Sequence, residues 1–136
     1  MFFEILSNDS DSMEVESIWV TPCEEGYMID NIPFYAKGVA YKDVMSAKKT
    51  DDGLYADELL SASQHSTIRI WFANEKLVAL TRQELKAMGC GSEISDSPRL
   101  IAVDIPPVIE YGHIKKYLDD GELSGKWDYE EACLGF

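Results

Sequence analysis

Short β-prone runs separated by turn residues fill the first half of the chain, and no amphipathic run of helical length interrupts them. This alternation predicts antiparallel strands. The predicted strands lie at residues 14–20, 27–32, 43–47 and 54–60. Gly26 closes the first hairpin, and Asp52-Gly53 supplies the tight turn of the second. We therefore expect four or five strands in a small, strongly bent sheet or partial barrel.

Strand and helix patterns alternate from about residue 65 onward. Thr67–Ala73 is the clearest strand, because it is rich in β-branched and aromatic residues. The elements expected after it are a helix ending near Gly89, strands at residues 92–95 and 100–105, a helix at 108–118 and a strand at 126–134. Their order is β-α-β-β-α-β, the order of the ferredoxin-like fold.

The helix ends depend on particular residues. The first helix begins either at Asn74, which can cap it, or at Arg82, since Thr81-Arg82-Gln83-Glu84 fits a capping box. In the second helix, Pro107 suits the first turn and Asp119-Asp120-Gly121 is a stop signal.

A chain of 136 residues, 46% of them hydrophobic, can bury the core of one domain. The predicted fold class is α+β, with a β-rich subdomain at residues 1–64 and a ferredoxin-like subdomain at residues 65–136 that form one compact unit. We expect Trp19, Trp71 and Trp127 to pack in the core, with partner contact as the alternative.

Acidic residues outnumber basic ones in both halves of the chain, and the net charge is −13. Residues 1–64 hold four Lys and Arg against thirteen Asp and Glu, whereas residues 65–136 hold eight against twelve. This charge repels nucleic acid and anionic lipid, so neither is an expected partner, and a basic protein is the natural complement.

Cysteine usage points to a reducing compartment. Cys23, Cys90 and Cys133 are an odd set without close spacing, and no signal peptide precedes them. No stretch reaches the roughly 18 apolar residues that span a bilayer. We expect a soluble cytoplasmic protein without a metal or cofactor, because no zinc-binding spacing occurs.

Six segments spread over the chain carry a family resemblance. They are Trp19-Val20, Asn31–Val39, His65–Arg69, Gly89-Cys90, Val103–Pro107 and Trp127–Cys133. With these segments the chain resembles the bacterial domain-of-unknown-function 4265 family, which has no agreed enzymatic activity; residues before Met13 have no counterpart in it. Small acidic proteins that resemble this family can act as immunity proteins for secreted toxin domains.

His65 and Ser66 are the only pair that suggests catalysis, as a general base and a nucleophile. Adjacent residues of a strand point to opposite faces, which favours a local structural role for both. Cys90 and Cys133 could join His65 in a metal or nucleophile site, but small buried cysteines are commoner. We therefore assign no catalytic residue and expect no enzyme.

Acidic side chains of the first half are the candidate partner-binding residues. They are Glu14, Glu16, Glu24, Glu25, Asp51, Asp52, Asp57 and Glu58. Such residues can mimic a polyanion and steer association with a basic active site, although they can also serve solubility alone. The expected function is an immunity protein that neutralises a cognate toxin domain, such as a nuclease. A small-molecule-sensing module is the alternative, and a hydrolase using His65 is a third possibility.

Overall fold

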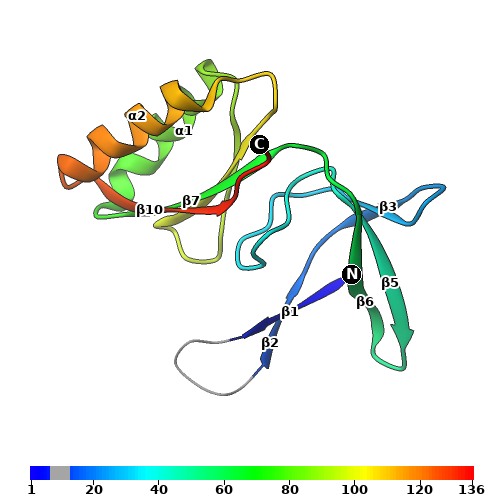
Figure 1. Cartoon of the computed structure of the whole chain (residues 1–136). Coiled ribbons are helices and arrows are strands. Elements are labelled where there is room, and N and C mark those ends of the chain that lie inside the picture. The colour runs from blue at the N-terminus through cyan, green and yellow to red at the C-terminus, as the bar shows by residue number, and fades with distance from the viewer. Residues whose placement is uncertain (7–12) are drawn as a thin grey trace.

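The computed structural model describes residues 1–6 and 13–136, which form two β-sheets and two α-helices (Figure 1). The strands of the first sheet are β1 (Phe2–Leu6), β2 (Met13–Ser17), β3 (Val20–Pro22), β4 (Tyr27–Ile29), β5 (Val44–Thr50) and β6 (Gly53–Ser61). They are ordered β2-β1-β6-β5-β4-β3. The α+β class and the strand-rich first half are confirmed.

The six-stranded sheet curls into a half-barrel. Strands β2 and β3 are its two edges, yet only Ile18 and Trp19 separate them along the chain, so the edges must approach each other. Ile18 is buried inside the curl together with Phe3, Ile29 and Met45. The continuous strand predicted at 14–20 is therefore wrong, because the chain turns at this buried isoleucine to pass from one edge to the other.

Strand β1 is an addition that the sequence reading did not predict. It pairs with β2 in antiparallel fashion and meets β6 in parallel orientation where Phe2 lies opposite Tyr55. The amino group of Met1 also donates a hydrogen bond of 3.0 Å to the Ile18 carbonyl. The residues before Met13 thus include a strand, and residues 7–12 lie outside the description.

The second half has the β-α-β-β-α-β order that was predicted. Its elements are β7 (Ser66–Phe72), the 3-10 turn η1 (Glu75–Leu77), α1 (Val78–Ala87), β8 (Gly91–Ile94), β9 (Leu100–Ile105), α2 (Tyr111–Leu123) and β10 (Trp127–Cys133). The antiparallel sheet is ordered β10-β7-β9-β8, and both helices cover one of its faces (Figure 1). Residues of both helices and of three strands share one core there.

The ends of both helices can be compared with the predicted ones. Asn74 caps the turn η1 through a bond of 2.9 Å from the Lys76 N–H, and α1 then runs on from Val78, so the earlier of the two possible starts is correct. The predicted stop of α2 at Gly121 is wrong, because α2 continues to Leu123. Gly121 is required there for space: a Cβ on it would lie 2.0 Å from the Trp127 ring.

Residues 30–43 cover the other face of the second sheet and join the two halves. The Thr67 hydroxyl donates to the Val39 carbonyl at 3.3 Å, and the Arg69 guanidinium donates to the Ala36 carbonyl. The Gly38 N–H donates a hydrogen bond of 3.0 Å to the carbonyl of Ala132, where a bulge interrupts the pairing of β10 with β7. At the opposite edge, Arg82 binds the Ser92 carbonyl of β8 at 3.0 Å.

Candidate functional site

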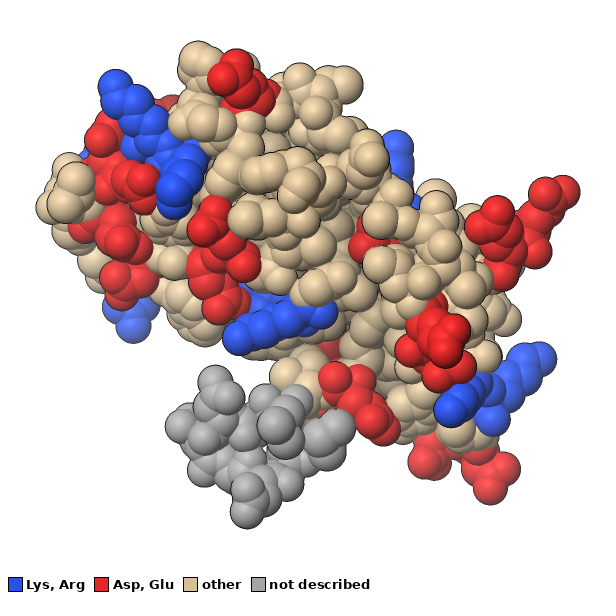
Figure 2. Space-filling model, in the orientation of Figure 1, with Lys and Arg blue, Asp and Glu red and all other residues tan. Residues whose placement is uncertain are grey.

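The eight acidic candidates are spread over the half-barrel and do not form one face. Glu24 and Glu25 lie in the β3–β4 turn, whereas Asp51 and Asp52 lie in the β5–β6 turn. In Figure 1 the β3–β4 hairpin projects to the right and the β5–β6 hairpin projects downward, so the two ends point in different directions. Figure 2 shows acidic side chains over both ends, with basic side chains among those near the β5–β6 hairpin.

The remaining candidates differ in exposure. Glu14 and Glu58 are exposed, and Asp57 forms an ion pair of 3.5 Å with Lys48. Glu16 is only 8% exposed. The expectation that Glu16 is exposed is therefore wrong, and its buried carboxylate cannot contact a partner directly.

Glu16 instead organises the segment that joins the halves. Its carboxylate accepts hydrogen bonds from the N–H groups of Phe34, Tyr35 and Ala36, at 2.7, 3.0 and 2.8 Å. The carbonyl of Ala36 accepts from Arg69, whose guanidinium also pairs with Glu130 at 2.8 Å. A chain of charge-assisted bonds thus runs from β2 through this segment to β7 and β10.

Among the described residues of the half-barrel, Trp19 is the most exposed large aromatic side chain, with 79% of its surface accessible. Its backbone is fixed, because its N–H donates to the Asn31 side chain at 2.6 Å and its carbonyl accepts the Asp30 N–H at 2.9 Å. Asp30 in turn accepts a bond of 3.2 Å from the Thr21 hydroxyl. The expected core position of Trp19 is wrong, since Ile18 takes the buried place; Trp127 is buried, and Trp71 is 46% exposed.

His65, directly before β7, forms a polar pair with Asp104 of β9. The His65 Nδ1 atom and an Asp104 carboxylate oxygen are 2.8 Å apart, and both side chains are 12% exposed. Burial raises the pKa of the Asp104 carboxyl above its usual range, and the hydrogen bond from His65 partly offsets this. The sequence signal for this partner was the single acid within the buried strand Leu100–Ile105.

Ser66 is not placed to act as a nucleophile for His65. Its Oγ accepts the N–H of Gly135 at 3.0 Å, and its side chain lines a cavity that His65 does not line. The His65 backbone N–H is bound by the Ser63 hydroxyl at 3.2 Å, and the His65 ring packs edge-on against Tyr41. These contacts agree with a local structural role for both His65 and Ser66.

The cysteines sit in three different environments. Cys23 is exposed, Cys133 is half-buried and Cys90 is buried. Burial, with the nearby Asp104 carboxylate, raises the pKa of the Cys90 thiol to about 11. Among the residues that the structure describes, no group of three or more His, Cys, Asp and Glu side chains is arranged to hold a metal ion.

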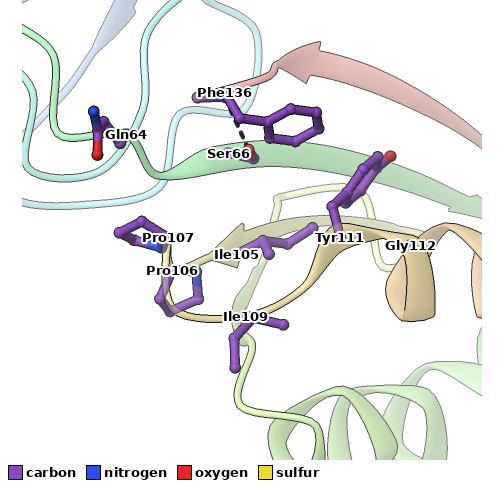
Figure 3. Close-up of a pocket in the computed structure, with 10 residues that line it drawn as sticks. Gln64, Ser66, Ile105, Pro106, Pro107, Ile109, Tyr111, Gly112 and Phe136 are labelled. Carbon is purple, nitrogen blue, oxygen red and sulfur yellow. Dashed lines mark hydrogen bonds between the residues drawn. The ribbon is translucent and has the colours of Figure 1, made fainter.

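A cavity of about 460 Å³ lies where the start of β7, the end of β9 and the first turn of α2 meet (Figure 3). Its walls are mostly apolar and include Ile105, Pro106, Ile109 and Phe136. The Tyr111 and Phe136 rings lie against each other at one side of it, tilted by 44° with their centroids 5.4 Å apart. Sequence patterns gave no sign of this cavity, because its walls come from three segments far apart in the chain.

None of the described helices is long and apolar enough to cross a membrane. A search of curated proteins gave no match. Among solved structures, the chain is similar to a hypothetical protein from Neisseria gonorrhoeae, with a TM-score of 0.84 and 22% sequence identity; the match covers 99% of this chain and 94% of that one. At this identity the likeness shows the fold alone. The sequence profile of the domain of unknown function DUF4265 matches residues 16–129, and the chain therefore belongs to the DUF4265 family.

Proposed function

We propose that this protein is an immunity protein that binds a basic toxin domain, such as a nuclease, and covers its active site. The observation that carries the proposal is the exposed Trp19 side chain on an acidic hairpin, at a position whose backbone is held by hydrogen bonds. The proposal assigns the chain no catalytic role. It places the protein in the bacterial cytoplasm, where it would protect the cell that makes the toxin.

Tryptophan is enriched among the few residues that dominate binding energy at protein interfaces. A side chain with 79% of its surface in water leaves a large apolar area unburied, and a partner would remove that area from water. The two backbone bonds at Trp19 reduce the backbone entropy that is lost when a partner binds, so that mainly the rotamer freedom of the side chain has to be given up. The outer face of the β3–β4 hairpin therefore has the properties of a preformed binding surface.

The charges around Trp19 favour a basic partner. Asp30 lies beside it, and Glu24 and Glu25 lie at the end of the same hairpin. The net charge of −13 adds long-range attraction toward a positively charged protein. Because nucleases bind a polyanion, a basic active site would attract this surface and be closed by it.

Co-expression with the basic domains encoded beside this gene tests the proposal. We expect one of them to stop growth alone and to be tolerated when the wild-type protein is present. Trp19→Ala should lose this protection and weaken binding about 100-fold or more, with little change in melting temperature. Leu123→Ala is the matched control, because Leu123 is 87% exposed on α2, and it should protect fully. Equal protection by both variants would contradict the role of the hairpin, and no protection by the wild type against any neighbour would contradict the immunity function.

A further inference from the structure

We propose that the cavity between β7, β9 and α2 binds a small, largely apolar molecule that carries an uncharged carbonyl oxygen. This proposal concerns a surface separate from the β3–β4 hairpin and does not depend on the immunity function. It is carried by the shape of the cavity, by one buried hydroxyl and by the absence of charged side chains among the described residues that line it.

The size and the walls of the cavity suit a small molecule. A volume of about 460 Å³ lies within the usual range of small-molecule sites. Pro106 lies on one side of the cavity, Ile109 lies between α1 and the strands, and the paired rings of Tyr111 and Phe136 lie on the other side (Figure 3). A flat ring or short hydrocarbon body would remove these surfaces from water.

Ser66 is the polar group that selects for an acceptor. The residue is only 3% exposed, and its Oγ accepts the Gly135 N–H at 3.0 Å. A hydroxyl also has one proton to donate, and within the described residues the Ser66 hydroxyl donates no hydrogen bond. A buried donor without a partner is unfavourable, so a ligand oxygen in the cavity would be stabilised by that proton.

The charge around the cavity favours a neutral oxygen over a carboxylate. No Asp, Glu, Lys, Arg or His side chain is among the described residues that line it. Burial and the hydrogen bond to Glu131 raise the pKa of the Tyr111 phenol above its usual range, so this group also stays neutral. An anion would find no cation in the walls and would meet a protein of net charge −13.

The last residues of the chain hold one wall in place. Gly135 packs directly on the backbone at the start of β7, where a Cβ would lie 2.2 Å from the Gln64 carbonyl oxygen. This contact fixes the backbone next to Phe136, whose ring is 80% exposed and lies against Tyr111. The wall is therefore preformed, while its aromatic face is still open to a ligand.

Titrations of ¹⁵N-labelled protein with three probes test the site: acetophenone, ethylbenzene, which lacks the carbonyl, and benzoate, which is charged. We expect acetophenone to give saturable shifts at the amides of Ser66, Gly112 and Gly135, with an affinity about tenfold higher than that of ethylbenzene. Benzoate should bind less tightly than acetophenone. No saturable shifts with acetophenone, or tighter binding of benzoate, would overturn the proposal.

Two variants assign the contacts. Ser66→Ala should lower acetophenone affinity about tenfold, to that of ethylbenzene, and Ser124→Ala at the far end of α2 should not change it. Phe136→Ala removes an exposed ring, so the variant should fold. It should weaken the binding of acetophenone and of ethylbenzene about equally. An unchanged acetophenone affinity in Ser66→Ala would contradict the assigned site. If that variant does not fold, an unchanged affinity in Phe136→Ala would contradict it.

Discussion

The Glu16 carboxylate satisfies three consecutive backbone N–H groups in the segment that joins the two halves. Replacing it by glutamine keeps the size of the side chain but removes the charge and turns an acceptor into a donor. We expect Glu16→Gln to lower the free energy of unfolding by about 2–3 kcal/mol in urea titrations. Glu14→Gln, at an exposed position of the same strand, should change it by less than about 0.5 kcal/mol. Equal effects of the two variants would show that the three bonds contribute nothing.

The thiols should differ in reactivity according to their surroundings. At pH 8, a Cys90 pKa of about 11 leaves roughly one thiol in a thousand as the reactive thiolate. In native protein at this pH we expect a disulfide reagent to modify the exposed Cys23 rapidly and Cys90 only after denaturation. Because the pKa of Cys90 is raised, its native reactivity should rise as the pH approaches 11. Rapid labelling of Cys90 in Cys23→Ser protein at pH 8 would contradict its burial.

Single residues also mark the limit of the sequence reading. Glu14 and Glu16 have the same spacing from the strand centre and the same side chain, so the pattern could not tell which one a distant segment would cover. Trp19 and Ile18 pose the same problem, because both are large and apolar and only the turn between β2 and β3 decides which is buried.

At the scale of elements, helix α2 contains one position where packing leaves room for glycine alone and another where a larger residue would fit. A Cβ at Gly121 would overlap the Trp127 ring, whereas a Cβ at Gly112 would have its nearest neighbour at 3.8 Å. We expect Gly121→Ala to lower the free energy of unfolding by about 2–3 kcal/mol. Gly112→Ala should instead raise it by up to about 1 kcal/mol, because alanine favours the helix. Calorimetry on both variants checks the signs, and a stabilising Gly121→Ala would mean that the ring and the helix are further apart.

Most elements could be predicted because their patterns are local. The β-α-β-β-α-β order follows from strand and helix periodicities. The second hairpin follows from the Asp52-Gly53 pair, and Gly53 has the positive φ, 132°, that this pair predicts. The end of α2 could not be predicted, since the stop signal at Asp119-Asp120-Gly121 is overridden by contact with Trp127. Strand β1 was also beyond local pattern, because its pairing depends on residues 13–17 and on Tyr55.

At the scale of the whole molecule, the two acidic hairpin ends should contribute unequally to partner binding. Under the proposed function, Glu24→Lys with Glu25→Lys should slow association with the toxin about tenfold, because these charges share a hairpin with Trp19. Asp51→Lys with Asp52→Lys, at the other hairpin end, should slow it less. Stopped-flow rates at about 0.05 M and about 0.5 M salt measure both, and the difference should shrink at high salt. A larger effect of the second pair would move the binding surface to the β5–β6 end.

The bonds that close the edges of the four-stranded sheet bear on how the protein behaves when crowded. An open strand edge is a template on which further chains can add and grow into fibres. Here the Gly38 N–H is bonded to the Ala132 carbonyl of β10, and the Arg82 guanidinium is bonded to the Ser92 carbonyl of β8. An incoming chain would have to displace one of these bonds to pair along the full length of either strand. The same contacts that assemble the fold therefore hinder its polymerisation.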